Sequence, residues 1–145
     1  MKTGIIDCGG GLRDIYGAGV FDFCLDNNIP FDVVIGISAG SANIASFISG
    51  QRGRNYRFYY EYPFRKEYMS FENFINKKYY LDLDYVYGEL SNSGGENPFD
   101  FEKFSENKCE KYIIATDAKT GKAQYFNANE IDKNNYWMLK ASSCI

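Results

Sequence analysis

The sequence predicts an α/β fold with a central, mostly parallel sheet. Two apolar runs, TGIIDC at 3–8 and FDVVIG at 31–36, each lead into a glycine-containing turn and then into a segment with helical spacing of apolar residues. Strands that alternate with helices favour parallel pairing with right-handed crossovers. A chain of 145 residues with 45% hydrophobic and 24% charged residues is typical of a globular protein of one domain. We therefore expect one domain over 1–145, without a separate second domain.

The first strand and helix are marked by a change of periodicity. The run 3–8 is short and apolar and stops at three glycines, as buried parallel strands often do. The next apolar side chains recur at three- and four-residue spacing, which predicts a helix ending near 27–28. These side chains are Ile15, Ala18, Phe21 and Leu25. Asp14 stands at the expected N-cap, where its carboxylate would accept from free N–H groups of the first turn.

The second strand and the later elements follow from similar patterns. A helix over 39–48 follows the strand 31–36 and is closed by Gly50. The region 56–90 is expected to be helical in pieces, with Ser70 capping a short helix. The remaining expectations are a loop over 92–98, a strand over 111–116, a turn over 117–121, a returning hairpin strand over 122–126 and a helix over 129–143.

A G-x-S-x-G pentapeptide, GISAG at 36–40, lies between the second strand and its helix. In this context the pattern predicts a nucleophile elbow, in which a sharp turn exposes a reactive serine hydroxyl, here that of Ser38. Gly36 and Gly40 leave space for the turn, and the small residues after Ser38 fit the start of the helix. The alternative is a tight turn without chemistry.

The three glycines after the first strand predict a partner loop for that serine. In a parallel sheet both turns leave the same edge, so N–H groups of Gly9, Gly10 and Gly11 can face Ser38 if the two strands are neighbours. Together with the N–H of Ala39, such donors would stabilise a developing oxyanion. Arg13 would brace the loop or attract an anionic substrate, or else be a plain surface charge.

Nucleotide or phosphate binding is a second interpretation of the glycines. The Walker pattern is absent, and a dinucleotide pattern that starts at Gly9 has Asp14 where its last glycine belongs. That fold also needs an acidic residue at the end of the second strand, whereas Asp32 stands at its start. These departures disfavour nucleotide binding but leave it as an alternative interpretation of the glycines.

The paired motifs GGGLR at 9–13 and GISAG at 36–40 resemble those of the patatin-like phospholipases, and ATDAKTGKAQYF at 115–126 and KASS at 140–143 are similar to later parts of bacterial members. The resemblance implies a three-layer α/β/α fold and lipid acyl hydrolysis by a Ser–Asp dyad without histidine. Ser38 would attack the acyl carbonyl and the glycine loop would hold the oxyanion. The dyad aspartate would lie in a D-G-G or D-G-A motif.

Two positions depart from that family pattern. Asp14 replaces the glycine after Arg13, and no aspartate of the chain is followed by Gly-Gly or Gly-Ala. We therefore expect the chain to be the N-terminal portion of one such domain, with the dyad aspartate beyond its end, and to be inactive alone. A non-catalytic fragment of the family is the alternative. Within the chain, Asp7 is a candidate for a catalytic or a supporting role beneath the glycine loop, and Asp117 for a turn.

Composition limits the ligands. A net charge of −3 and a pI near 5.0 argue against nucleic-acid binding. The absence of histidine and the scattered cysteines give no zinc site, and we expect no cofactor. Without an apparent secretory signal or membrane span, the expected location is cytoplasmic, with free thiols.

The arginines in 52–57 are expected to be solvated or to contact an anion. The aromatic run 56–68 would pack in the core, line an acyl channel or meet a membrane surface.

Overall fold

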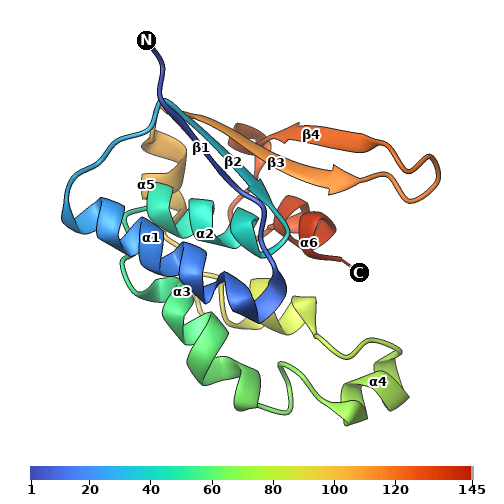
Figure 1. Cartoon of the computed structure of the whole chain (residues 1–145). Coiled ribbons are helices and arrows are strands. Elements are labelled where there is room, and N and C mark those ends of the chain that lie inside the picture. Colours follow the sequence, from blue (N-terminus) through green and yellow to red (C-terminus); the bar gives the residue numbers. More distant parts are fainter. Residues whose placement is uncertain (145) are drawn as a thin grey trace.

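A computed structural model describes residues 1–144, and the last residue of the predicted domain, Ile145, lies outside them. The strands form one sheet in the order β1-β2-β3-β4 (Figure 1). β1, β2 and β3 run parallel, and β4 pairs antiparallel with β3 as a hairpin. Their bounds are Gly4–Asp7, Val33–Ile37, Glu110–Thr116 and Ala123–Asn127. The predicted α/β fold with a mostly parallel sheet is confirmed.

The register of the sheet brings the two glycine motifs to one edge. Asp7, the last residue of β1, pairs with Gly36 of β2, and Ile37 of β2 pairs with Ile114 of β3. β1 and β2 are therefore direct neighbours whose carboxyl ends lie side by side. The glycine loop at 9–11 and the turn at Ser38 leave from this edge, as parallel pairing requires.

The helices agree closely with the expectations for the first half of the chain. α1 spans Ile15–Asp26 and α2 spans Ala39–Ile48, with Gly50 at a φ of 67° after its end. The region after α2 is a series of short helical turns, in which Ser70 does cap α4. The other α-helices are α3, α4, α5 and α6, over Arg54–Tyr56, Phe71–Lys77, Phe101–Glu106 and Trp137–Ser143.

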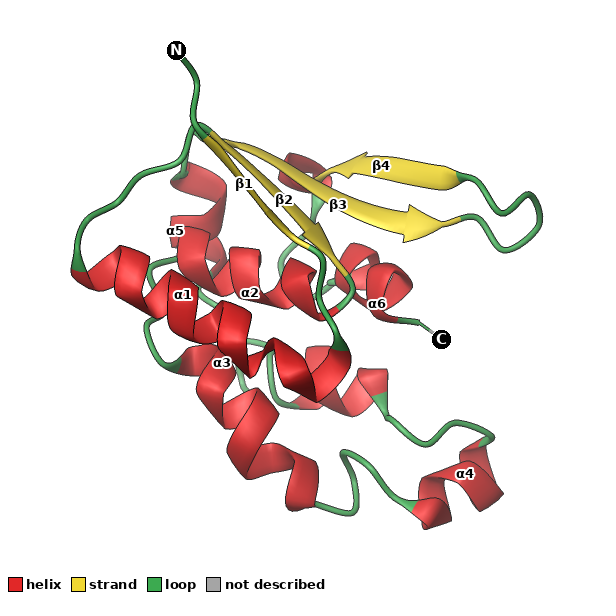
Figure 2. Cartoon of the chain, in the orientation of Figure 1, coloured by secondary structure: helices red, strands yellow, loops and turns green. Residues whose placement is uncertain are grey.

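The helices that touch the sheet lie on one of its faces (Figure 2). α2 packs on β1 and β2, α6 packs on β3, and α2 and α6 contact each other. On this face Val34 and Ile113 are buried with Ile44 and Met138 of the two helices. On the other face Ile6 is 61% exposed. Residues 1–144 thus form one helical layer on the sheet, and the second layer of a three-layer arrangement is not formed by them.

The helix predicted over 129–143 was too long. The chain instead forms a 3₁₀ turn at Ala128–Glu130 and a tight turn in which Asn135 N–H donates to the Asp132 carbonyl at 3.1 Å. α6 begins only at Trp137. Asparagine and aspartate side chains compete for backbone partners and tolerate a positive φ, which Asn134 adopts at 60°. This local chemistry outweighs the helical spacing of the apolar residues.

The aromatic run 56–68 divides between core and surface. Phe58, Tyr62 and Tyr68 are buried, whereas Tyr60 and Phe64 are 56% and 83% exposed. Core packing therefore explains part of the run.

In residues 1–144 no helix is both long enough and apolar enough to span a bilayer.

Candidate active site

Ser38 has the backbone of a nucleophile elbow. It lies between the end of β2 and the start of α2 with φ 56° and ψ −130°, a region that residues other than glycine rarely adopt. A Cβ at Gly36 would lie 2.5 Å from the Ser41 Cα, and one at Gly40 would lie 2.4 Å from the Asp7 carbonyl oxygen. Both glycines are therefore required by space, and the turn holds Ser38 in a strained conformation.

The glycine loop lies directly against this elbow. Gly9, Gly10 and Gly11 all have positive φ, at 70°, 144° and 60°. A Cβ at Gly9 would lie 2.5 Å from the Ile37 carbonyl oxygen and 3.0 Å from the backbone nitrogen of Ala39. The two segments that the sequence marked as donors for an oxyanion are thus in contact. Only glycine allows the backbones to approach this closely.

Ser142 fixes the elbow from a distant part of the chain. The Ser38 N–H donates to Ser142 Oγ at 2.7 Å, and the Ser142 hydroxyl donates to the Ile114 carbonyl at 2.6 Å. α6 is thereby joined to the turn at Ser38 and to β3. The sequence predicts no role for Ser142, which lies in the KASS segment at 140–143. Sequence gives no sign of a contact between residues 104 positions apart.

Replacing Ser142 with alanine is expected to slow the reaction of Ser38 about tenfold, because the elbow loses the hydrogen bond that holds its backbone. The rate of fluorophosphonate labelling at Ser38 measures this directly. A threonine at position 142 keeps the hydroxyl and should restore most of the rate. Ser143→Ala removes instead a hydroxyl that contacts the Tyr87 hydroxyl at 3.0 Å. An equal slowing by Ser143→Ala would show a general effect of destabilising α6.

Asp7 supports the glycine loop. Its Oδ1 accepts from the Gly9 N–H at 3.0 Å and its Oδ2 accepts from Asn43 Nδ2 at 3.0 Å. Both carboxylate oxygens are therefore engaged, which favours the supporting role over a catalytic one. Asp117 binds the N–H groups of Lys119 and Thr120 in the hairpin turn, and these bonds lower its pKa. The turn interpretation of Asp117 agrees with these contacts.

The expected capping role of Asp14 is wrong. Asp14 does precede α1, but its side chain makes no cap hydrogen bond and is buried. Its Oδ2 instead accepts from Asn43 Nδ2 at 2.9 Å, the same nitrogen that contacts Asp7. A Cβ at Gly17 would lie 2.6 Å from Asp14 Oδ1 and 2.7 Å from Asp7 Oδ2, so the two carboxyl groups are neighbours. Burial, with the nearby Asp7 carboxylate, raises the pKa of Asp14 to about 7.

This raised pKa predicts that the contribution of Asp14 to the stability of the protein falls as the pH rises. The unfolded Asp14 ionises near pH 4 and the folded one near pH 7, so the folded state binds more protons between these values. The contribution of Asp14 to folding stability is then fully present below pH 4 and is lost as the pH rises to about 7. Between pH 5 and pH 8, the change in the free energy of unfolding should therefore differ by roughly 2 kcal/mol between the wild type and Asp14→Asn. Urea unfolding at both pH values measures it, with the exposed Asp132→Asn as control. Parallel curves for the wild type and Asp14→Asn would contradict the prediction.

Asn43 connects this carboxyl pair to the next layer of polar groups. Its Oδ1 accepts from Asn55 Nδ2 at 2.8 Å. The single proton of the Tyr59 hydroxyl is shared between Asn43 Oδ1 at 3.0 Å and the Ala39 carbonyl at 3.1 Å. Asn43 is fully buried in α2. Sequence reasoning missed it, although an asparagine among the small and apolar residues of a predicted core helix was an available signal.

Arg54 is not the solvated arginine or surface anion contact that we expected in 52–57. It is buried, and burial lowers the pKa of Arg54 to about 10. Its guanidinium lies 4.6 Å from the centre of the Phe58 ring and donates to Ser91 Oγ at 2.9 Å. Arg52 does behave as a surface charge and pairs with Asp26 at 2.6 Å. The hydroxyl contacts and the aromatic ring compensate part of the cost of burying the charge of Arg54, whose Nε has no hydrogen-bond partner within residues 1–144.

The predicted site residue Arg13 is exposed, and its Nε lies 3.5 Å from the Gly10 carbonyl oxygen as a long hydrogen bond. This contact is compatible with the bracing role.

A cavity of about 580 Å³, lined by residues that include Cys24, Phe47 and Cys109, lies beside the starts of β2 and β3. It is therefore at the opposite edge of the sheet from Ser38 and takes no part in this site.

Comparisons with known proteins agree with these motifs. A family model described as patatin-like phospholipase matches residues 8–141. The uncharacterized protein YjjU of Escherichia coli (strain K12) is 35% identical over 79 residues, which are 54% of this chain and 22% of that protein. The matched part of the chain thus covers less than a quarter of the length of this relative. No solved structure gives a significant match. Because the family model covers most of the chain, the chain belongs to the patatin-like phospholipase family.

Proposed function

We propose that the complete protein hydrolyses carboxylic ester bonds of lipids through an acyl intermediate on Ser38. The observation that carries this proposal is the strained turn at Ser38 with the glycine loop packed against it, at one edge of a parallel sheet. Membership of the patatin-like phospholipase family supports a lipid ester as the substrate. No cofactor is needed for this reaction.

The reaction begins with attack of Ser38 Oγ on the acyl carbonyl carbon. The carbonyl oxygen becomes negative and accepts hydrogen bonds from the N–H groups of Gly10, Gly11 and Ala39. The predicted donor Gly9 is different, because its N–H is engaged by Asp7 Oδ1. The positive end of the ten-residue helix α2 lies at this position and favours the same charge. Collapse of the intermediate expels the alcohol and leaves an acyl ester on Ser38, which water then hydrolyses.

The proton of Ser38 must go to a base other than histidine, since the chain contains none. We propose an aspartate as this base, as in the Ser–Asp dyad that the family resemblance implies. Asp7 is occupied by Gly9 and Asn43, and Asp117 by its own turn. The proposal therefore places the dyad aspartate in a part of the protein outside this chain, and residues 1–145 alone are expected to be inactive.

The proposed substrate also sets where the enzyme acts. Lipid esters are concentrated in bilayers and droplets, so catalysis requires contact with a lipid surface. We propose such peripheral contact for this protein, with acyl chains reaching Ser38 from that surface.

Incubating the complete protein with phosphatidylcholine vesicles tests the function. We expect release of free fatty acid and covalent labelling of Ser38 by a fluorophosphonate probe, located by peptide mass spectrometry. Isolated residues 1–145 should release none. Titration with nucleotides serves as the control for the second interpretation of the glycine loop. Nucleotide binding without ester hydrolysis or labelling would refute the proposed function.

A further inference from the structure

The short helix α4 is oriented opposite to an ordinary surface helix. Its apolar residues Phe71, Phe74 and Ile75 form one stripe and are 71%, 52% and 60% exposed. Asn73, on another face, is only 7% exposed. A surface helix normally turns its apolar stripe towards the core and its polar face to water. α4 turns a polar side chain inward and an apolar stripe outward.

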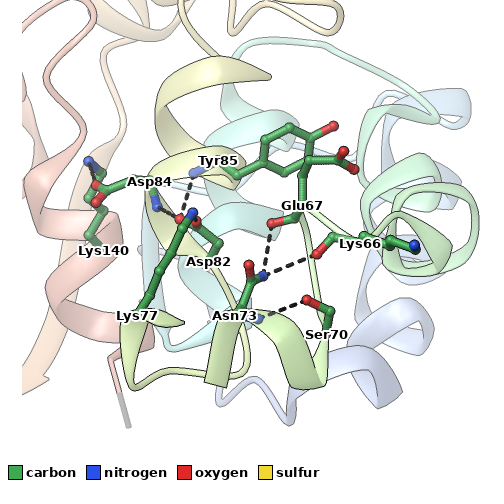
Figure 3. Close-up of polar contacts among 9 residues, drawn as sticks. All are labelled: Lys66, Glu67, Ser70, Asn73, Lys77, Asp82, Asp84, Tyr85 and Lys140. Atoms are coloured by element: carbon green, nitrogen blue, oxygen red, sulfur yellow. Dashed lines mark hydrogen bonds and ion pairs between the residues drawn. The ribbon is translucent and has the colours of Figure 1, made fainter. Parts of the chain in front are cut away.

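Specific hydrogen bonds hold α4 in this orientation (Figure 3). The Asn73 side-chain nitrogen donates to the carbonyls of Lys66 and Glu67 at 3.2 Å each. The Asn73 N–H donates to Ser70 Oγ at 3.0 Å and so caps the helix. The hydrogen bonds of Asn73 to the two backbone carbonyls form only when Asn73 faces inward, and this orientation turns the apolar stripe outward. The outward direction of Phe71, Phe74 and Ile75 is therefore built into the local structure.

The segment 66–84, which we call the α4 excursion, is also closed at its base. Met69 and Leu81 form a bridge, and Asp82 accepts from Lys77 Nζ at 2.6 Å (Figure 3). Asp84 pairs with Lys140 of α6 at 2.5 Å. Figure 1 shows the excursion projecting from the body on the side towards which the carboxyl ends of the strands point. The apolar tip thus extends on the same side as Ser38.

The chemistry of the tip fits a lipid surface. Tyr79 and Tyr80, which follow α4, are 40% and 49% exposed, and tyrosine prefers the boundary between acyl chains and headgroups. Lys78 follows α4 with a φ of 67°, and its Nζ donates to the Ile75 carbonyl at 3.2 Å at the end of the stripe. Lys78 and Lys66 are both exposed. Lysine side chains beside an apolar tip can reach lipid phosphates while the tip enters the acyl region.

We propose that the α4 excursion docks the protein on a lipid bilayer by inserting Phe71, Phe74 and Ile75, with Lys66 and Lys78 at the headgroup phosphates. This inference rests on the proposed function for its purpose, which is to bring Ser38 to its substrate. Binding itself does not require Ser38 to react. The ion pair of Asp84 with Lys140 places the docked segment next to α6, whose Ser142 holds the elbow.

Vesicle flotation tests the proposal with the complete protein. The vesicles are phosphatidylcholine alone and equal parts of phosphatidylcholine and phosphatidylglycerol. We expect the double variant Phe71→Ser, Ile75→Ser to lose about tenfold in binding for each side chain, because each removes an apolar group that enters the bilayer. Phe23→Ser is the matched control, since Phe23 of α1 is 60% exposed but outside the excursion. It should bind as the wild type does.

A fluorescent variant covers the case in which the double variant does not fold. Phe74→Trp adds a tryptophan at the tip, and its emission, taken as the difference from the emission of the wild type, should shift to shorter wavelength when vesicles are added. Binding of the wild type to neither vesicle, unchanged binding of the double variant, or an unshifted tip tryptophan would overturn the proposal. The proposal would also be overturned if the stripe joined two protein chains. In that case the double variant would show a lower sedimentation mass than the wild type in the absence of lipid.

The proposed function is tested separately by Ser38→Ala, which should bind vesicles as the wild type does. Vesicle binding that depends on Phe71 in a protein without ester hydrolysis would refute the hydrolase and keep the docking surface. If the double variant hydrolysed vesicle lipid as fast as the wild type, the docking surface would be refuted and the hydrolase would be kept. For the double variant, hydrolysis of a short, water-soluble ester should be unchanged, because these side chains lie outside the catalytic site.

Discussion

Replacing Ser38 with alanine is expected to reduce ester hydrolysis by the complete protein by at least about a thousandfold and to abolish its labelling by fluorophosphonates. The physical reason is that the route through an acyl ester on Ser38 is lost, so that only direct attack by water on the substrate remains. The glycine loop would still bind the carbonyl oxygen, so a small residual rate above water remains. Turnover of a chromogenic ester and free fatty acid release measure the effect.

Two controls separate this effect from damage to the fold. Ser105→Ala removes an exposed hydroxyl of α5 and should leave the rate unchanged. Ser38→Ala should unfold at the same urea concentration as the wild type or a slightly lower one. A Ser38→Ala enzyme that kept wild-type turnover would show that another group is the nucleophile, and Ser38 would then be a structural turn.

Replacing Gly40 with alanine is expected to destabilise the protein by about 3 kcal/mol or more, the upper end of the cost of an overpacked core. The new methyl group would lie 2.4 Å from the Asp7 carbonyl oxygen and 2.7 Å from Asp7 Oδ1. Alanine would favour the helix itself, so the loss comes from the contact with β1. Relief of this contact would move Asp7 and with it the N–H of Gly9. We therefore expect at least a tenfold loss of activity as well.

Gly19→Ala is the matched control for Gly40→Ala. Gly19 lies inside α1, and a Cβ there meets nothing within 4 Å. Alanine should stabilise this helix by about 0.5–1 kcal/mol. Urea denaturation of both variants provides the comparison. Equal effects of the two substitutions would mean that helix propensity, and not the close approach to Asp7, determines the behaviour of Gly40.

Much of the sheet edge around Ser38 was predictable, because it depends on local sequence. The apolar runs before GGGLR and GISAG, the glycines and the small residues after Ser38 describe two strands with two tight turns. Parallel pairing then places both turns at one edge, provided that the strands are neighbours. α1, α2 and the cap at Ser70 follow in the same way from side-chain spacing and from capping residues. The roles of Ser38 and of the glycine loop in catalysis stay predictions.

The expectations that failed concern polar residues whose partners are remote in sequence. Asp14 has the position of an N-cap but turns inward, because Asn43 of α2 offers a buried amide close to Asp7. Arg54 stands in a charged run but is buried among hydroxyl groups and aromatic rings. Local sequence cannot distinguish a solvated charge from a compensated one, since compensation is supplied by groups from other elements.

The sequence by itself determined the two strands, the two glycine turns and the family to which the chain belongs, because tight turns and helix periodicity are set by neighbouring residues. Only the tertiary structure decided that Gly9 lies against Ala39, that Ser142 holds the backbone of Ser38 and that α4 presents Phe71 and Phe74 to solvent. Each of these depends on how distant segments pack. Hydrogen bonds across that packing, and not local propensity, fix the direction in which a side chain points.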